Sequence, residues 1–314
     1  MNDRWCLQNV SLKYMLSDLT LFVRTLYLRV KQFEVIDPAA PVNTKWLPSH
    51  KLANGEHGFL LRSLPLAEIQ PRLSVKSGFI CYIPAQFERC YIDLAMTFEE
   101  YSNTFSAKSR STIRRKIRKF NEFCNQNMHF EVYKNADEMQ TFYQLARTLS
   151  EKTYQEKLLD AGLPDSEAFR QEMKEKAQQD QVRGYLLLND KKPVAYMYCP
   201  IFDGVVLYQH LGFDPDYKKL SVGTILHWLV FENLFQESKF RFFDFTEGSS
   251  DHKQMYSTGR ILCGNIFILE NAFSMRFWIR CHMLVEDFSL GLGKLFDALG
   301  LKAKIKRFIR YGSG

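Results

Sequence analysis

The stretch Tyr217-Lys218-Lys219-Leu220-Ser221-Val222-Gly223-Thr224 joins a predicted strand, Val205 to Gly212, to a predicted helix from Gly223 to about Gln236. The first backbone N–H groups of a helix lack partners and carry partial positive charge, so they favour phosphate. Three of the four residues from Ser221 to Thr224 are small, which lets a phosphate approach the backbone, and the lysine pair adds positive charge. The stretch therefore predicts a phosphate-binding turn between a strand and a helix.

Strands and helices alternate on both sides of this turn. From Phe130 onward the pattern predicts the order β-α-α-β-β-β-α-β-α-β. The predicted strands are 130–133, 184–188, 194–201, 205–212, 240–245 and 261–269, and the predicted helices are 136–154, 166–177, 223–236 and 252–256. Such alternation indicates an α/β (α+β) protein with a mixed sheet flanked by helices. No Gly-x-Gly-x-x-Gly follows a first strand, which excludes a doubly wound nucleotide-binding fold.

The N-terminal third is less regular. We predict a helix near 14–30 and strands at 33–36, 78–83 and 90–94, followed by a helix with Thr97 as its hydroxyl N-cap. A stronger helix covers Ser109 to Cys124, because Ile113, Ile117, Phe120 and Cys124 recur at helical spacing. Arg110, Arg114 and Arg118 repeat every four residues on a different face. One face is therefore expected to pack while the other is cationic.

Positive charge is concentrated in two segments. The chain has a net charge of +7, while Lys108 to Lys119 holds seven basic residues and Lys302 to Arg310 holds five, in both cases without an acid. Without these twelve cations the rest of the chain would carry −5. The first segment has no aromatic residue to stack on bases, so it does not indicate a general nucleic-acid interface. The second has the composition of an interfacial helix attracted to anionic lipid, or of a segment that docks on the protein itself.

The composition also excludes several other classes of protein. No run approaches the roughly 20 apolar residues of a membrane-spanning helix, and the N-terminus lacks the order of a signal peptide. Seven scattered cysteines show no zinc-binding spacing and fit reduced thiols better than a disulfide framework. We therefore expect a cytoplasmic protein without a metal site.

Two further runs complete a resemblance to a known family. Phe242-Phe243-Asp244-Phe245-Thr246-Glu247-Gly248, followed by Lys253, resembles the Phe-Asp-Phe-x-x-Gly…Lys signature of a subgroup of GNAT acyltransferases. This subgroup includes the cellulose-biosynthesis acetyltransferase-like proteins and is related to the FemAB peptidyltransferases. Lys108-Ser109-Arg110-Ser111-Thr112-Ile113-Arg114-Arg115 resembles the basic helix before the transferase domain in the same group. The turn at Tyr217 to Thr224 departs from the common GNAT form, because Ser221 stands where the first glycine is usual.

The resemblance, which covers about residues 100–270, implies acetyl-coenzyme A or another acyl-coenzyme A as cosubstrate. Its pyrophosphate would bind at Lys218, Lys219, Ser221, Val222, Gly223 and Thr224, and its pantetheine arm would pair with the strand Val205 to Gly212. Direct transfer needs a base and an acid. Glu247 is the expected base, Tyr256 the expected acid, and Asp244 either a second acid/base group or a structural one.

The same resemblance implies where the acceptor binds. Tyr208 and His210 are expected on one face of the pantetheine-pairing strand, where they line the acceptor channel. Lys253 is expected to bind an anionic acceptor or the cofactor phosphate. Arg110 and Arg114, on the basic helix, would face an anionic acceptor.

The predicted organisation has three parts. Residues 1–130 form a diverged GNAT-like lobe that ends in the basic helix, 131–290 the GNAT domain, and 291–314 a basic amphipathic tail on a peripheral membrane surface. The predicted function is acyl transfer to an amine or hydroxyl acceptor connected with exopolysaccharide or envelope synthesis. Two alternatives remain: a FemAB-like transferase that uses aminoacyl-tRNA, and a non-catalytic membrane-associated module.

Overall fold

The chain divides into two units that are each built from separate segments. The computed structural model describes residues 5–17, 19–38, 48, 52–153, 162–248 and 250–298, with the backbone alone for 294–298. The first unit consists of Met1–Phe33, Ala39–Phe87 and Leu262–Gly314, and the second of Glu34–Pro38 and Glu88–Ile261. The boundaries fall inside two strands, β6 (Gln86–Asp93) and β13 (Gly259–Glu270).

These units differ from the predicted division at residue 130. The basic helix lies in the second unit, and the chain after residue 262 belongs to the first. The reason is a long-range pairing, since β13 pairs with β3 (Gly58–Pro65), about 200 residues earlier in the chain. No local pattern in the sequence reports such a pairing. That the N-terminal part is a diverged GNAT-like lobe stays a prediction.

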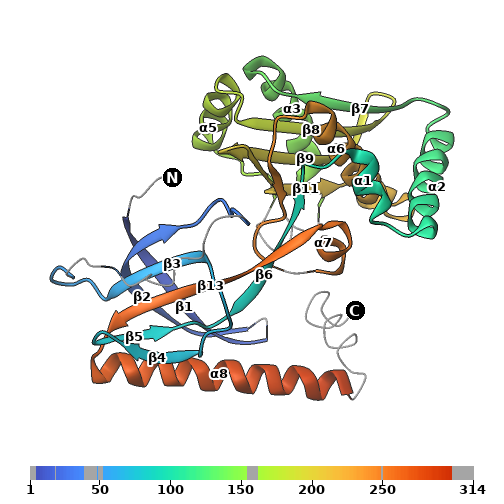
Figure 1. Ribbon diagram of the computed structural model, residues 1–314. Coiled ribbons are helices and arrows are strands. Elements are labelled where there is room, and N and C mark those ends of the chain that lie inside the picture. Colours follow the sequence, from blue (N-terminus) through green and yellow to red (C-terminus); the bar gives the residue numbers. More distant parts are fainter. Residues whose placement is uncertain are drawn as a thin grey trace, which may run out of the picture. The chain divides into compact units, whose positions relative to one another are not determined.

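The first unit is a twisted sheet with a long helix (Figure 1). β1 (Cys6–Leu16) and β2 (Leu19–Gln32) form an antiparallel hairpin, and β2 runs parallel to β3. β13 then pairs with β3 and with β5 (Phe79–Tyr82), which pairs with β4 (Leu73–Lys76). The buried side chains on one face of this sheet pack against α8 (Phe273–Ala298), and those on the other face form a separate cluster.

The predicted helix at 14–30 is wrong, because this segment forms most of the β1–β2 hairpin. Its buried residues alternate with period two, as in Val10, Leu12 and Tyr14 of β1 and Leu26, Leu28 and Val30 of β2. Residues 33–36, predicted as a strand, lie outside the strands.

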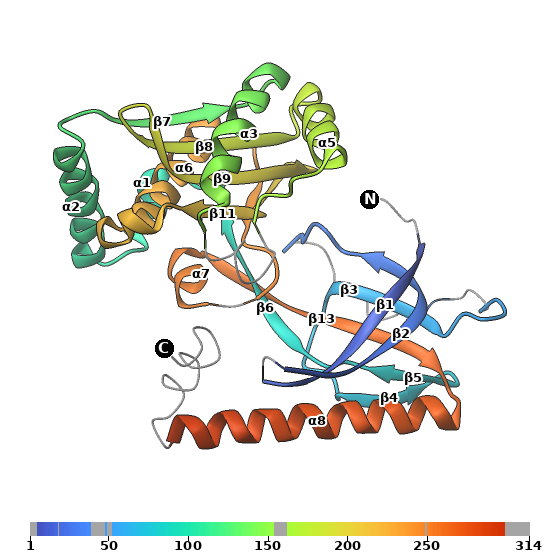
Figure 2. The same cartoon turned by 180° about the vertical axis from the view of Figure 1, so that it is seen from behind.

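The second unit is a mixed sheet with helices on both faces, as predicted. Its strand order is β6-β12-β10-β9-β8-β7, and β11 pairs with β9. The strands not yet given are β7 (Met128–Tyr133), β8 (Val182–Asn189), β9 (Lys192–Phe202), β10 (Val205–Leu207), β11 (His210–Phe213) and β12 (Phe242–Asp244). One face packs against α1 (Phe98–Asn103), α2 (Ala107–Phe123) and α6 (Val222–Glu237). The other packs against α3 (Ala136–Ser150) and α5 (Glu167–Gln178), which Figure 2 shows from behind.

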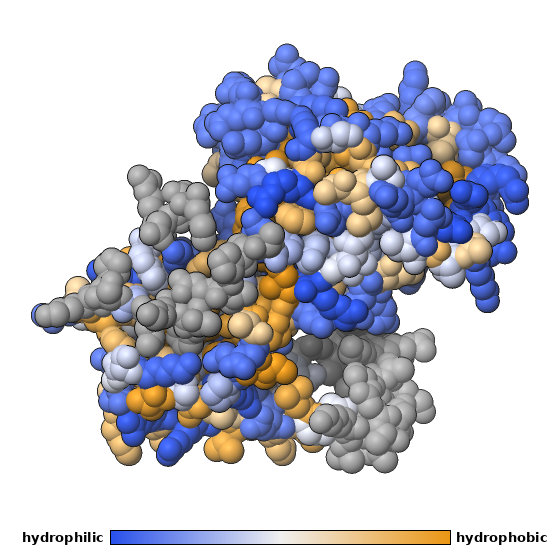
Figure 3. All heavy atoms as spheres, viewed as in Figure 1, coloured by the Kyte–Doolittle hydropathy of each residue, from blue (hydrophilic) through white to orange (hydrophobic). Residues whose placement is uncertain are grey.

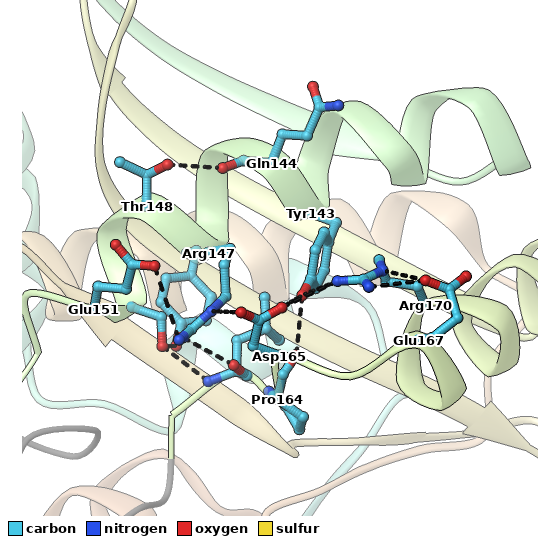
Figure 4. Close-up of polar contacts among 12 residues, drawn as sticks. Tyr143, Gln144, Arg147, Thr148, Glu151, Pro164, Asp165, Glu167 and Arg170 are labelled. Atoms are coloured by element: carbon cyan, nitrogen blue, oxygen red, sulfur yellow. Dashed lines mark hydrogen bonds and ion pairs between the residues drawn. The ribbon is translucent and has the colours of Figure 1, made fainter.

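A polar network joins α3 to the start of α5 (Figure 4). Arg170 pairs with Asp165 at 3.0 Å and with Glu167 at 2.8 Å. The Tyr143 hydroxyl donates to the carbonyl oxygen of Pro164 at 3.1 Å, and Arg147 donates to that of Leu163 at 3.1 Å. These bonds fix the two helices together on one face of the sheet.

Within the described residues, no helix combines the length and apolar character needed to span a bilayer. The same part of the chain contains no group of three His, Cys, Asp or Glu residues arranged to hold a metal ion. None of the seven cysteines, all of which lie among the described residues, forms a disulfide.

Candidate active site

The predicted strand 205–212 is interrupted at Tyr208 and Gln209. Before the break, β10 pairs in parallel with β12, and the last bond runs from the Tyr208 N–H to the carbonyl oxygen of Asp244 at 2.8 Å. After the break, β11 pairs with β9 and, among the described residues, with no other strand. One edge of β11 is therefore open to a ligand that offers backbone-like hydrogen bonds.

The loop after β12 is held by a lysine. Lys253, on α7 (Asp251–Tyr256), donates from Nζ to the carbonyl oxygens of Phe245 at 2.7 Å and Glu247 at 2.8 Å. Burial lowers the pKa of Lys253. Thr246, with a φ of 59°, donates from its hydroxyl to the carbonyl oxygen of Tyr208 at 3.2 Å. The loop thus spans the strand break and presents the exposed side chain of Glu247 beside it.

Asp244 lies in a buried ion pair. Its Oδ1 accepts from Arg89 Nε at 3.0 Å, and its Oδ2 lies 2.7 Å from Arg89 Nη2. The Thr246 N–H also donates to Oδ1, at 2.8 Å. Burial raises the pKa of Asp244, and the guanidinium of Arg89 opposes that shift. Of the two predicted roles for Asp244, these contacts fit the structural one.

The predicted phosphate-binding turn has an uncapped helix N-terminus. A 3₁₀ helix, η1 (Pro215–Leu220), carries the exposed Lys218 and Lys219 and leads to Ser221, which adopts a left-handed conformation with φ of 58°. The Ser221 side chain makes no capping hydrogen bond to α6. A Cβ added to Gly223 would meet Phe213 at 3.6 Å, an ordinary contact, so packing within the chain does not require glycine there.

One residue of this region was missed by the sequence analysis, His227. Its Nδ1 lies 2.7 Å from the carbonyl oxygen of Gly223, which can only accept, so Nδ1 carries the proton. Nε2 is buried and has no hydrogen-bond partner among the described residues. Burial lowers the pKa of His227 to about 4, so the ring is neutral at pH 7 and Nε2 offers a lone pair. A lone histidine in an apolar helix, four residues after the glycine, is the signal that could have found it.

Tyr256 stacks on His227, with ring centroids 5.4 Å apart and planes at 13°. Burial raises the pKa of Tyr256 to about 12, against a smaller opposite effect of the nearby Thr224. Within the described part of the chain its hydroxyl meets no partner in hydrogen-bond geometry. Of the two stacked rings, His227 thus buries a polar atom that has no partner among the described residues, while the Tyr256 hydroxyl lies near Thr224. Buried polar atoms without partners are rare in native proteins.

Tyr208 and His210 lie on opposite faces of the sheet, which corrects the prediction that they share one. The Tyr208 ring is 5.5 Å from His227, on the face covered by α6. His210 instead contacts Phe169 and Tyr198 at 6.0 Å each, on the face covered by α3 and α5. Tyr208 lies in the break and His210 begins β11, so the alternation of a continuous strand does not apply to the two residues. Burial lowers the pKa of His210 to about 4.

The basic helix packs beside the phosphate-binding turn. The predicted apolar face of α2 is confirmed: Ile113, Phe120 and Cys124 are buried, and rings of Phe120 and Phe123 lie 6.3 and 5.9 Å from Tyr217 of η1. Arg110 donates from Nη1 to Asn103 Oδ1 at 2.7 Å, so its guanidinium is hydrogen-bonded to the end of α1. An open concave surface runs along the helix and is lined by Ala107, Arg110, Ser111, Arg114, Arg115 and Arg118. The basic tail, Lys302 to Arg310, lies outside the described residues.

Solved structures resemble this chain over most of its length at low sequence identity. The first is the C-terminal DUF2156 domain, from Agrobacterium fabrum, of a protein assigned as a lysylphosphatidylglycerol synthetase, with 12% identity, a TM-score of 0.47, and 75% of this chain and 73% of that chain covered. The second is L-PGS from Bacillus licheniformis, with 12% identity, a TM-score of 0.46 and 71% of each chain covered. FemX matches at 10% identity and a TM-score of 0.40, covering 58% of this chain and 62% of its own.

Comparison with protein families finds a match to part of the chain. No curated protein sequence matches the chain significantly. Residues 107–254 match the family described as Acetyltransferase (GNAT) domain. This range begins with α2 and ends inside α7, so it contains the phosphate-binding turn, the strand break and the loop held by Lys253. Residues 107–254 of this chain are therefore similar to a GNAT acetyltransferase domain.

Proposed function

We propose that this protein transfers an acyl group directly from acetyl-coenzyme A or another acyl-coenzyme A to an amine or hydroxyl acceptor. The strand break at Tyr208 and Gln209 is the observation that carries this proposal. It leaves one edge of β11 open, and the chain continues from β11 through η1 to the uncapped N-terminus of α6. A ligand with amide groups at one end and a pyrophosphate at the other suits this sequence of features, because the amides extend the sheet and the phosphates meet the helix.

In this proposal the pantetheine arm pairs with β11 and the pyrophosphate binds the N–H groups from Ser221 to Thr224. The Val222 side chain is buried, so its backbone alone contributes. Lys218 and Lys219 are exposed beside the turn and add charge from solvent. Gly223 keeps the backbone accessible to the phosphates.

The reaction needs one proton taken and one proton given. The acceptor nitrogen or oxygen attacks the thioester carbonyl carbon, the carbon–sulfur bond breaks, and the proton of the acceptor passes to a base. Glu247 is the proposed base, because its loop is fixed beside the strand break by Lys253. Tyr256 is the proposed acid for the leaving thiolate, since a pKa of about 12 keeps its hydroxyl protonated at neutral pH.

His227 and Asp244 receive different roles. The free lone pair on His227 Nε2 is proposed to accept a hydrogen bond from the bound substrates, because a buried acceptor without a partner is costly until a donor arrives. Asp244 is proposed to hold the loop through Arg89 rather than to exchange protons.

The acceptor is proposed to be anionic and connected with cell-surface polysaccharide or envelope synthesis. Support comes from the exposed Arg114, Arg115 and Arg118 on the concave surface along α2, and from the resemblance of the loop Phe242 to Gly248 to envelope-related transferases. The same cationic surface favours one alternative, an aminoacyl-tRNA donor, because it would bind a phosphate backbone equally well.

Calorimetric titration with acetyl-coenzyme A tests the donor site. Gly223→Glu places a carboxylate at the proposed pyrophosphate site and should weaken binding by at least ~100-fold, or about 2.7 kcal/mol. Gln236→Glu is the matched control, because it adds the same charge at the exposed far end of the same helix and should bind as the parent does.

Loss of binding in a Gly223→Glu protein that keeps the parent melting temperature would support the donor site. Equal binding by both variants would refute that site. A parent protein that binds no acyl-coenzyme A of any chain length, but binds aminoacyl-tRNA in a salt-sensitive manner, would make the tRNA-dependent reaction the better assignment.

A further inference from the structure

Helix α8 is apolar on two opposite sides, and the first unit covers one of them. Met275 and Ile279 are buried against the strands of that unit. On the same side, His282 Nδ1 lies 2.7 Å from the Tyr82 hydroxyl, and His282 Nε2 lies 3.1 Å from the carbonyl oxygen of Lys13. This side therefore attaches the helix to its sheet and leaves the other side without cover from the described residues.

Four large apolar side chains occupy the uncovered side. Phe273 is 87% exposed, Phe277 53%, Leu284 69% and Phe288 62%. Their spacings of four, seven and four residues place them within about 60° of one another on a helix with 3.6 residues per turn. Figure 3 shows hydrophobic residues along the lower edge of the molecule, where Figure 1 places α8. Monomeric proteins in water rarely expose so many large apolar side chains along one side of a helix.

The stripe continues onto the β1–β2 hairpin. The ring of Phe22 stacks on that of Trp278 at 5.3 Å, and Trp278 contacts Phe277 at 5.6 Å. At the other end of α8, the N–H of Ser17 donates to Ser289 Oγ at 2.8 Å, which brings the hairpin turn to the helix. Leu19, Leu21, Phe22 and Val23 near this turn are exposed. The tip of the hairpin, with its exposed apolar residues, thus lies beside α8.

The charges beside the stripe are positive. Arg276 and Arg280 are exposed next to it, one turn apart. Two acids of α8, Glu286 and Asp287, both pair with Arg72, whose single charge offsets one of their two negative charges. The chain that follows α8 adds five basic residues and no acid between Lys302 and Arg310. This charge favours an anionic partner.

A second copy of the chain fits this surface poorly. If two α8 helices packed antiparallel along the stripe about a twofold axis, the axis would lie midway between Phe273 and Phe288. Arg280 is at that midpoint and would face its own copy, which opposes association. An apolar stripe flanked by arginines instead has the form of a helix that lies in the plane of a membrane interface.

We propose that the face formed by Phe273, Phe277, Leu284 and Phe288, together with the hairpin tip, docks on an anionic lipid membrane. The aromatic side chains enter the boundary between headgroups and acyl chains, and Arg276 and Arg280 meet lipid phosphates. This surface belongs to the first unit and does not depend on the proposed acyl transfer. It would bring a lipid-linked acceptor near the protein without a membrane-spanning helix.

Vesicle co-sedimentation of the full chain tests the proposal. The parent should bind phosphatidylcholine vesicles with 30% phosphatidylglycerol at least tenfold more strongly than pure phosphatidylcholine vesicles, with weaker binding at high salt. Phe277→Asp with Phe288→Asp should lose at least tenfold of that binding. The matched control is Leu7→Asp with Tyr27→Asp. It adds the same charge at exposed apolar residues of the same unit, on the face of the β1–β2 hairpin opposite to the one that packs against α8, and should bind as the parent does.

Brominated lipids give a second readout that is specific for place. They should quench tryptophan fluorescence in the parent and much less in Trp278→Phe, because Trp278 borders the stripe. Failure of the parent to bind vesicles, or an equal loss in the control pair, would overturn the proposal. So would a parent dimer in size-exclusion chromatography that Phe277→Asp with Phe288→Asp dissociates, because the stripe would then bind a second copy.

Discussion

Helices α6 and α8 are both rich in apolar residues, but the protein covers them to different extents. α6 lies between the sheet of the second unit and helices α1 and α2, and its apolar residues are buried nearly all round. α8 has one buried side and one exposed apolar side. A helix that is apolar on every side needs cover on every side. α6 obtains that cover from its own unit, whereas α8 lacks it on one side within the described chain.

The buried histidines of these helices show a second difference. His282 of α8 has a partner on each ring nitrogen. His227 of α6 has a partner on Nδ1, and its buried Nε2 has none in the described structure. A buried histidine with both ring nitrogens hydrogen-bonded supports the fold, while one with a ring nitrogen that lacks a partner can bind a ligand there. The comparison therefore supports the proposals that His227 of α6 contacts a ligand and that His282 holds α8 to its own sheet.

The largest expected effect concerns the ion pairs of the two units. Arg89→Met leaves the carboxylate of Asp244 buried without a counter-charge and should lower the free energy of unfolding by about 3–5 kcal/mol. Arg72→Met removes a more exposed pairing with Glu286 and Asp287 of α8 and should cost about 0–1 kcal/mol. Urea denaturation measures both changes. The reverse order would show that α8 is anchored by charge and not by its apolar side.

The next effect compares one leucine from each helix. Leu226 of α6 is fully buried, so Leu226→Ala should destabilise the protein by about 2–5 kcal/mol through the cavity it leaves. Leu284 of α8 is exposed, so Leu284→Ala should change stability by no more than about 0.5 kcal/mol. The same denaturation experiment without lipid gives both values. A large loss for Leu284→Ala would mean that the stripe is covered in solution.

The smallest effect on stability concerns the two histidines. His282→Phe removes one hydrogen-bond partner of the Tyr82 hydroxyl and the side-chain partner of the Lys13 carbonyl oxygen, and should cost about 1–3 kcal/mol. His227→Phe removes an acceptor that already lacks a partner, so the change should stay within about 1 kcal/mol, while acyl transfer falls by about 10²-fold or more.

A pH profile sharpens this last comparison. Because burial holds the pKa of His227 near 4, the loss of transfer in His227→Phe should be constant between about pH 5 and pH 8. A loss that appears only above about pH 6.5 would mean that His227 titrates as an ordinary exposed histidine, contrary to its position in the fold.

The elements that the sequence predicted well are those whose signals are local. The apolar spacing of Ile113, Phe120 and Cys124 placed α2, and Thr97 caps α1 as expected, with Glu100 completing the capping box. The β1–β2 hairpin was missed because the first half of β2, around Leu21, is exposed on both faces and so lacks the alternation of a half-buried strand.

The candidate site was only partly predictable for a similar reason. The turn from Tyr217 to Thr224 is contiguous and chemically distinctive. The strand break at Tyr208, in contrast, depends on a partner strand more than 30 residues later, so Tyr208 and His210 were placed on one face. Arg89, the partner of Asp244, lies 155 residues away and had no local signal.

The division of the chain into units sets an order for folding during synthesis. The segment Glu88–Ile261, which supplies nearly all of the second unit, emerges from the ribosome as one piece. The first unit must wait for β13, which pairs with β3 across about 200 residues, and for α8 after it. Pairings this distant form slowly. The hairpin Cys6–Leu16 and Leu19–Gln32 is therefore synthesised long before β13 and α8, and its apolar residues that pack against them stay uncovered until both have emerged.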